Sequence, residues 1–197
     1  MPQFIETIRI EQGQAHHLDL HQQRINRTLA KFYPHSHFFL STMLPHPLPM
    51  ERCKWRIVYG EEVVSTSLEL YNPRSIETLR LLDSQFSYEY KFLNRTAIDN
   101  AFAQRGDADD VLFLHNGFIT DTSIFNVAFF DGLHWLTPAS PLLKGTMRHH
   151  LIDLKVIFEA ELNINDLTSF SQVSLFNALN PWGEIVLDIS SIQDCSL

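Results

Sequence analysis

The chain has 197 residues, of which 45% are hydrophobic and 19% are charged, the balance of an ordinary soluble globular protein. Its formal net charge is −8 and its Lys and Arg residues are scattered, which argues against a nucleic-acid surface and against a polybasic membrane anchor. No apolar run approaches the roughly 20 residues needed to cross a bilayer, and the N-terminus lacks the pattern of a signal peptide. The two cysteines, Cys53 and Cys195, fit no zinc spacing, so we expect a reduced, cytoplasmic protein without a metal site.

The first half of the chain predicts a strand, a helix and a hairpin. A strand is expected over residues 4–10, and apolar residues at helical spacing predict a helix over 19–32. Two segments rich in β-formers, 54–59 and 63–71, are separated by a short glycine-containing turn and predict a hairpin. We interpret residues 72–83 as a linker.

The second half begins with a strictly alternating segment, 84–91, in which aromatic residues share one face and Lys91 lies on the other. This alternation predicts a strand that ends at Lys91. Asn94 is of a type that caps helices, and Gly106 is of a type that ends them. A helix is therefore expected between these two residues.

Two dipeptides of the kind that form tight hairpin turns follow. Asn116-Gly117 joins expected strands at 111–114 and 118–121, and Asp131-Gly132 joins expected strands at 126–130 and 133–136. Later elements are a helix over 145–159 and closing strands at 174–176 and 185–189. The whole pattern predicts an α+β fold with two domains: a small N-terminal domain, 1–82, and a larger C-terminal domain, 83–197.

Four side chains or segments could carry chemistry, although each taken alone has an ordinary explanation. A strand-end lysine such as Lys91 is usually solvated, but in an apolar cleft its amine can become neutral and attack an aldehyde. Asp121 could be a turn residue, or it could keep a pyridine nitrogen protonated. Arg24 could be a solvated helix residue or a bidentate phosphate ligand. The helix start at Gly145-Thr146 offers backbone N–H groups that bind phosphate readily.

The order of these segments resembles that of a known family. The relevant runs are Lys91-Phe92-Leu93-Asn94-Arg95, Asn116-Gly117-Phe118-Ile119-Thr120-Asp121, Asn126-Val127-Ala128-Phe129, Leu142-Leu143-Lys144-Gly145-Thr146-Met147-Arg148, Phe176-Asn177-Ala178-Leu179 and, near the N-terminus, Phe4-Ile5-Glu6-Thr7-Ile8-Arg9 and His21-Gln22-Gln23-Arg24-Ile25. They resemble the class IV aminotransferases, or fold type IV enzymes, which include branched-chain and D-amino-acid aminotransferases and aminodeoxychorismate lyases. The resemblance covers nearly the whole chain.

The resemblance implies a pyridoxal 5′-phosphate enzyme in which Lys91 forms the Schiff base and carries the proton. It also implies that Asp121 takes the position facing the pyridine nitrogen, where the family usually has glutamate. Further roles follow for two groups of residues. Arg24 and the backbone N–H groups of Thr146 and Met147 would bind the cofactor phosphate, and Arg95, Asn177 and Ala178 would contact substrate. Family members are usually homodimers, so the resemblance also implies a homodimer.

The activity within the family stays open between alternatives. The segments at Leu93-Asn94-Arg95, Gly145–Arg148 and 177–179 look most like aminodeoxychorismate lyases, whereas Leu143-Lys144-Gly145 looks more like D-amino-acid aminotransferases. We expect an aminodeoxychorismate lyase-like enzyme. The alternatives are a D-amino-acid or branched-chain-type aminotransferase, and a catalytically degenerate protein that binds the cofactor or a partner.

The histidines are interpreted as surface residues. His17 and His21 lie four residues apart on the expected first helix, a spacing that could bind a metal ion, but no third ligand accompanies them. We therefore expect both to face solvent.

Overall fold

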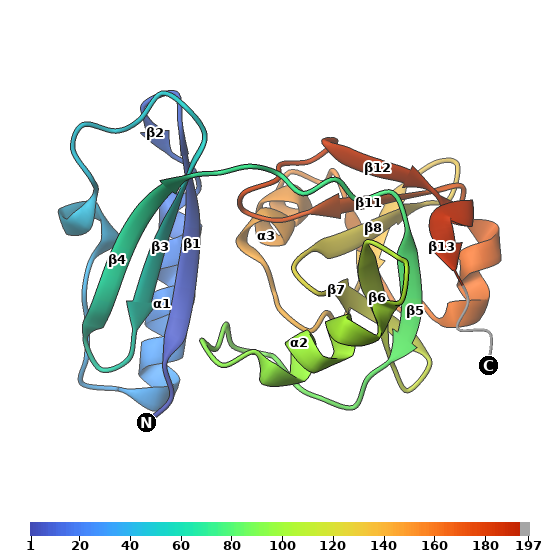
Figure 1. Cartoon of the computed structure of the whole chain (residues 1–197), viewed down its shortest axis with the longest axis horizontal. Coiled ribbons are helices and arrows are strands. Elements are labelled where there is room, and N and C mark those ends of the chain that lie inside the picture. The colour runs from blue at the N-terminus through green and yellow to red at the C-terminus, as the bar shows by residue number, and fades with distance from the viewer. Residues whose placement is uncertain (194–197) are drawn as a thin grey trace. The chain divides into compact units, whose positions relative to one another are not determined.

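The computed structural model describes residues 1–193, which form two compact units (Figure 1). The first unit contains residues 1–73 and 90–94, and the second contains residues 74–89 and 95–193. The chain therefore passes between the units three times. The division differs from the expected boundary at residues 82 and 83, because the expected linker contains strand β5, Leu79–Asp83, which pairs with a strand of the second unit.

An antiparallel sheet and a helix make up most of the first unit. The strands lie in the order β2-β1-β3-β4, and a single helix packs on one face (Figure 1). The elements are β1 Phe4–Glu11, β2 Gln14–Ala15, α1 Leu18–Phe32, the 3₁₀ turn η1 Leu40–Met43, β3 Cys53–Tyr59 and β4 Val63–Leu70. The strand, helix and hairpin expected from the sequence are confirmed.

The side-chain alternation of β1 determines which of its residues face α1. Phe4, Ile8 and Ile10 are fully buried and pack against Ile25 and Leu29 of α1. Successive side chains of a strand point to opposite faces, so Glu6 has the same phase as these apolar residues. A carboxylate therefore lies on the buried face of the sheet, where it needs partners.

The second unit contains two sheets. One has the strand order β10-β9-β8-β11-β12 and the other β13-β5-β6-β7. Besides β5, its elements are α2 Thr96–Phe102, η2 Ala103–Arg105, β6 Asp110–His115, β7 Phe118–Thr122, β8 Asn126–Phe130, β9 Trp135–Pro138, α3 Thr146–Asp153, β10 Phe158–Ala160, η3 Ile164–Ser169, β11 Gln172–Phe176, β12 Ile185–Asp188, η4 Ile189–Ser191 and β13 Ile192–Gln193. The α+β class expected from the sequence is confirmed.

The main core of the second unit lies between its two sheets. Leu81 and Leu112 from β5 and β6 pack in one cluster with Phe129 and Val173 from β8 and β11. A second cluster joins α3 to the five-stranded sheet through Met147 of the helix and neighbouring buried residues. The strand β7, which ends close to Asp121, is therefore fixed by packing on a rigid scaffold.

The segment 84–91 is not the strand that its alternation predicts. Ser84 still donates its backbone N–H to Leu114 O, as an extension of β5. The strand β6, which pairs with β5, ends at His115. The residues that follow Ser84 therefore have no part of β6 to pair with. Phe86 and Tyr88 nevertheless pack inward, because Phe86 contacts the ring of Phe113 and Tyr88 is only 8% exposed.

The two predicted tight turns have different outcomes. Asn116 and Gly117 have φ values of 52° and 80°, which confirms the left-handed turn between β6 and β7. In the next hairpin only Gly132 has a positive φ. The connection there spans four residues, because Asp131 Oδ1 accepts hydrogen bonds from the backbone N–H groups of Leu133 and His134.

One helix, α2, begins at a different residue than expected, and another, α3, ends at a different residue than expected. The N-cap of α2 is Arg95, one residue beyond Asn94, and its side chain makes no capping hydrogen bond. The helix α3 ends at Asp153 rather than near 159. Lys155 then adopts a left-handed conformation, with φ of 57°, and the chain turns into β10, which pairs with β9 in parallel.

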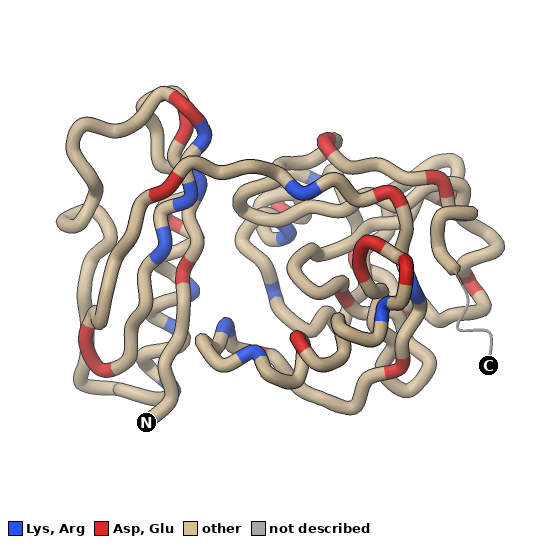
Figure 2. The backbone as a smooth tube through the Cα atoms, viewed as in Figure 1, with Lys and Arg blue, Asp and Glu red and all other residues tan. Residues whose placement is uncertain are grey.

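Basic and acidic residues are interspersed along both units (Figure 2). None of the helices within residues 1–193 is long and apolar enough to cross a membrane.

Candidate active site

A buried carboxyl group, Asp121, is the centre of a polar network in the second unit. Asp121 lies on β7 and is 4% exposed. Asn126 Nδ2 donates to Asp121 Oδ1 at 2.8 Å, and the backbone N–H of Leu143 donates to Oδ2 at 2.8 Å. Asn126 Nδ2 also donates to Leu143 O at 2.8 Å, which ties the two partners to each other. Both carboxyl oxygens are therefore held by fixed donors.

The electrostatic environment of Asp121 makes its proton exchangeable near neutral pH. Burial raises the pKa of Asp121 to about 7, because an ionised carboxylate is poorly solvated there. The hydrogen bonds from Leu143 and Asn126 and the charge of Arg148 lower the pKa, but by less than burial raises it. A carboxyl with these properties can exist as carboxylate beside a protonated nitrogen base, and as acid without one.

The start of α3 adjoins the same network. Gly145 is the N-cap of α3 and its extended backbone provides no capping side chain. Thr146 and Met147 form the first turn of the helix and are both buried. The first N–H groups of a helix have no partner within the helix and attract anions. The segment from Leu143 to Met147 thus connects the Asp121 network to a helix N-terminus.

Gly145 has no room for a side chain, and this gives a testable prediction. A Cβ at this position would collide with the side-chain amide of Asn126, which is fixed between Asp121 and Leu143 O. We expect Gly145→Ala to destabilise the protein by about 1–3 kcal/mol in urea unfolding. The matched control is Gly60→Ala, where the nearest atom would be 3.5 Å away and the backbone φ is not positive. Equal stability of the two variants would contradict this role of Gly145.

Two of the expected substrate-contacting residues meet at the turn between β7 and β8. Arg95 donates from Nη2 to Ser123 O at 2.7 Å, and Asn177 donates from Nδ2 to Ile124 O at 3.2 Å. Asn177 Oδ1 accepts from the backbone N–H groups of Leu179 and Asn180, so its side chain also shapes the loop that contains Ala178. These contacts order the turn that follows Asp121 in the sequence.

Lys91 belongs to the first unit, where its backbone is paired with β1. The N–H of Ile5 donates to Lys91 O at 2.9 Å, and the N–H of Leu93 donates to Gln3 O at 2.8 Å. Phe92 forms an isolated antiparallel bridge with Phe4 and its ring contacts the Phe4 ring. The lysine is therefore held by a short paired segment at the edge of a sheet, rather than by the strand end that the sequence predicts.

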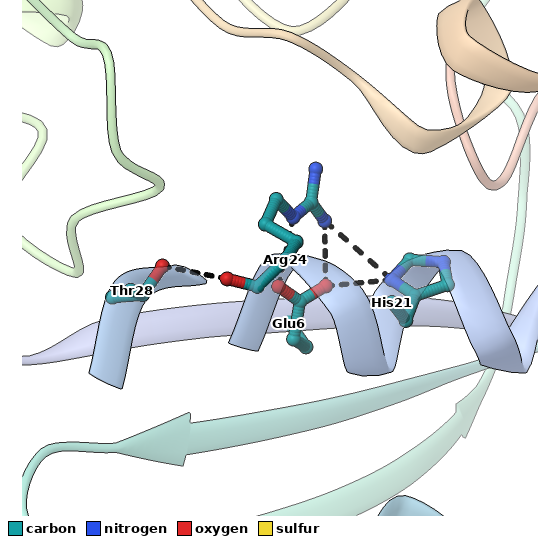
Figure 3. Close-up of polar contacts among 4 residues, drawn as sticks. All are labelled: Glu6, His21, Arg24 and Thr28. Carbon is teal, nitrogen blue, oxygen red and sulfur yellow. Dashed lines mark hydrogen bonds and ion pairs between the residues drawn. The ribbon is translucent and has the colours of Figure 1, made fainter. Parts of the chain in front are cut away.

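Arg24 lies in a buried cluster with Glu6 and His21 (Figure 3). Its Nε donates to Glu6 Oε1 at 2.8 Å and its Nη2 donates to Oε2 at 2.5 Å, so the two groups form a bidentate pair. His21 Nδ1 lies 2.6 Å from the same Oε2. The expectation that His21 faces solvent is wrong: the residue is fully buried, because it lies one helical turn from Arg24 on the face of α1 that covers Glu6.

The charges of this cluster follow from the pKa shifts. Burial alone would raise the pKa of Glu6, but the charge of Arg24 and the hydrogen bonds from Arg24 and His21 hold it at about 2. Burial lowers the pKa of His21, and the positive charges of Arg24 and Lys91 lower it further, against the effect of Glu6. At neutral pH Glu6 is therefore ionised and His21 is neutral. Because a carboxylate can only accept, His21 Nδ1 carries the hydrogen of the shared bond.

The structure groups the candidate residues into two sets. In the second unit, Asp121 shares a network with the segment that leads to Thr146 and Met147, and Arg95 and Asn177 hold the turn after it. In the first unit, the charge of Lys91 contributes to the lowered pKa of His21, which belongs to the same cluster as Arg24. Sequence reasoning missed three residues, Glu6, His21 and Asn126. For Glu6 a signal was present, since it has the same alternation phase as Phe4, Ile8 and Ile10.

Comparison with known proteins identifies the family. The family model described as "Amino-transferase class IV" matches residues 63–187. An uncharacterized protein of Haemophilus influenzae is 33% identical over 90% of this chain and 97% of its own length. A Schizosaccharomyces pombe protein named "Putative aminodeoxychorismate lyase" is 32% identical over 75% of this chain and 71% of its own length.

A solved structure gives the same result. The crystal structure of a protein of Haemophilus somnus, described as a "putative 4-amino-4-deoxychorismate lyase", is 32% identical and covers 92% of this chain and 98% of its own, with a TM-score of 0.85. Together with the family model, these similarities confirm the resemblance seen in the sequence. The chain therefore belongs to the class IV aminotransferase family of enzymes.

Proposed function

We propose that the chain is a pyridoxal phosphate-dependent enzyme with aminodeoxychorismate lyase-like activity, releasing pyruvate and p-aminobenzoate from aminodeoxychorismate. The buried Asp121 carboxyl, with both oxygens fixed and its pKa raised to about 7, carries the cofactor part of the proposal. The lyase part is supported by the 32% identity, over 92% of the chain, to the Haemophilus somnus protein.

The residues of the second unit fit the ring and the phosphate of this cofactor. Asp121 is suited to face the pyridine nitrogen, since a carboxylate there keeps that nitrogen protonated. The first-turn N–H groups of Thr146 and Met147, at a helix start where a Cβ on Gly145 would collide with Asn126, are suited to the phosphate. Arg95 and the Asn177-Ala178 loop are the proposed substrate contacts.

Two residues of the first unit are suited to attach the cofactor aldehyde and to bind its phosphate. The amine of Lys91 is the proposed attachment point of the cofactor aldehyde, and Arg24 is the proposed side-chain ligand of its phosphate. When bound, pyridoxal phosphate supplies a ring that withdraws the electron pair left on a substrate carbon when a bond to that carbon breaks. The substrate amine would displace the Lys91 amine from the aldehyde, and the freed Lys91 Nζ would take the proton from the substrate Cα and carry it until the product is released. Asp121 would keep the pyridine nitrogen protonated.

An activity assay tests this proposal against its alternatives. Purified protein supplied with pyridoxal phosphate should release pyruvate from aminodeoxychorismate. Oxo acids formed from a panel of L- and D-amino acids, without pyruvate from aminodeoxychorismate, would support an aminotransferase instead. Cofactor binding without either activity would support a binding protein.

The proposal includes a cytoplasmic homodimer. The family resemblance supports the homodimer, and the low cysteine content, two residues in 197, suits a reducing compartment. Light scattering of the purified protein should give the mass of two chains, and a stable monomer would contradict the homodimer.

A further inference from the structure

We propose that Glu6 is a positioning residue that fixes the Arg24 guanidinium for the phosphate group of the cofactor, with His21 supporting Glu6 from the other side. The inference rests on the proposed function, in which Arg24 binds that phosphate. It assigns a role to a fully buried carboxylate and a fully buried histidine.

The location of Glu6 makes a purely stabilising role a poor explanation. Glu6 lies between Phe4 and Ile8 on the buried face of β1, against α1. Removing two charges from water costs about as much as their attraction returns, so a buried ion pair adds little net stability. Its main consequence is geometric, because a charge buried in this way holds its partner in one orientation.

The hydrogen-bond pattern shows how that orientation is fixed. Glu6 accepts hydrogen bonds from Nε and Nη2 of Arg24, and these two bonds occupy one edge of the planar guanidinium. The remaining nitrogen, Nη1, points away from Glu6 (Figure 3). Thr28 Oγ1 donates to Arg24 O at 2.9 Å and fixes the backbone of the same turn. This bidentate pair, called the fork below, sets the direction of Nη1. The buried Glu6 carboxylate holds the guanidinium plane, which the flexible arginine stem alone would not fix.

His21 limits the freedom of the carboxylate itself. Its Nδ1 donates to Glu6 Oε2 at 2.6 Å, the oxygen that also accepts from Arg24 Nη2. Burial and the charges of Arg24 and Lys91 lower the pKa of His21, so it donates as a neutral group and adds no charge. The cluster therefore consists of one compensated ion pair, Glu6 and Arg24, and one neutral support, His21.

The test compares two ligands that differ only in the phosphate. Binding of pyridoxal phosphate and of pyridoxal is titrated by absorbance for the wild type and for Glu6→Gln. In glutamine one of the two accepting oxygens is replaced by an NH2 group, which cannot accept a hydrogen bond from Arg24. The fork would therefore break without a change in side-chain size. We expect the Kd for pyridoxal phosphate to rise about tenfold or more, as for a lost charged hydrogen bond, and the Kd for pyridoxal to change by less than about twofold.

A matched control on the same strand separates this effect from a general loss of charge. Glu11→Gln removes a carboxylate from β1 that pairs with Arg9 and Arg52 at the partly exposed end of the strand. This variant should bind both ligands as the wild type does. In an Arg24→Ala background, Glu6→Gln should cause no further loss of affinity for pyridoxal phosphate, because Glu6 acts through Arg24.

A second variant covers the case in which Glu6→Gln does not fold. His21→Gln keeps the Glu6–Arg24 fork and removes only its support, so we expect a smaller loss of affinity for pyridoxal phosphate alone. If the wild type binds pyridoxal phosphate and these variants bind it equally well, the positioning role is overturned while the cofactor assignment stands. Equal losses for both ligands would likewise overturn it, since the defect would not concern the phosphate. A wild type that binds no pyridoxal phosphate would overturn the proposed function and this inference together.

Discussion

Replacing Lys91 by alanine should abolish covalent attachment of pyridoxal phosphate and reduce turnover by at least about four orders of magnitude. The proposed role of Lys91 combines cofactor attachment with proton transfer at the substrate carbon, and proton transfer alone contributes about 10²–10⁴-fold. Reduction of the loaded protein with borohydride, followed by peptide mass spectrometry, measures the attachment. The labelled peptide of the wild type should be the one that contains Lys91.

Lys54→Ala provides the control for this experiment. Lys54 lies on β3 of the same unit and pairs with Glu69 on β4, away from the candidate residues in the sequence and in the sheet. This variant should retain the cofactor, its absorbance band and full activity. A cofactor label on a lysine other than Lys91, or a Lys91→Ala protein that keeps the wild-type band, would refute the assignment.

Asp121→Asn should lower turnover by about 10²–10³-fold, the range for loss of a preorganised electrostatic contact. An amide cannot keep a pyridine nitrogen protonated, so the ring withdraws electrons less effectively. Asp131→Asn is the same substitution at an exposed turn and should leave turnover unchanged. Similar rates for the wild type and Asp121→Asn would exclude the proposed role of this carboxyl.

The same variant gives a pH-dependent change in stability without any cofactor. The pKa of Asp121 is about 7 in the folded protein and its ordinary value is 3.8, so the folded state holds a proton that the unfolded state releases. The resulting stability is complete below pH 3.8 and is lost as the pH rises through 7. Relative to Asp121→Asn, the free energy of unfolding of the wild type should fall by roughly 2–3 kcal/mol between pH 5 and pH 8.

Urea unfolding of both proteins at the two pH values measures this difference. The amide has one acceptor oxygen, so either Asn126 or Leu143 loses its acceptor, at a cost that does not depend on pH. Only the change in the difference between pH 5 and pH 8 therefore reports on the proton. Parallel pH dependences of the two proteins would show that Asp121 ionises at its ordinary pKa.

Much of the fold could be predicted where the local sequence has only one stable solution. Asn116 and Gly117 both accept positive φ, and the turn between β6 and β7 forms as expected. Asp131-Gly132 has similar chemistry, but the Asp131 side chain caps two backbone N–H groups and a longer turn results. The alternation at 84–91 describes which side chains are buried, whereas a strand also needs a neighbouring strand, which the local sequence does not encode.

The candidate site was predictable only in part, for a related reason. Lys91, Asp121 and Arg24 could be named because their segments match those of a family. Their partners depend on tertiary contacts: the Leu143 N–H that holds Asp121 is 22 residues away in the sequence, and Glu6 is 18 residues from Arg24. A polar residue such as His21 on a helix is usually exposed, and only the position of Glu6 on the facing strand makes its burial favourable.

The three passages of the chain between the units have a practical consequence for anyone who divides this protein. A fragment that ends at Pro73 would contain α1 and all the strands of the first sheet, yet it would lack residues 90–94. The backbone groups of Gln3 and Ile5 that pair with Leu93 and Lys91 would then become an open β-edge, a template for aggregation. A soluble excised version of this unit therefore requires residues 90–94 to be grafted back through a new connection.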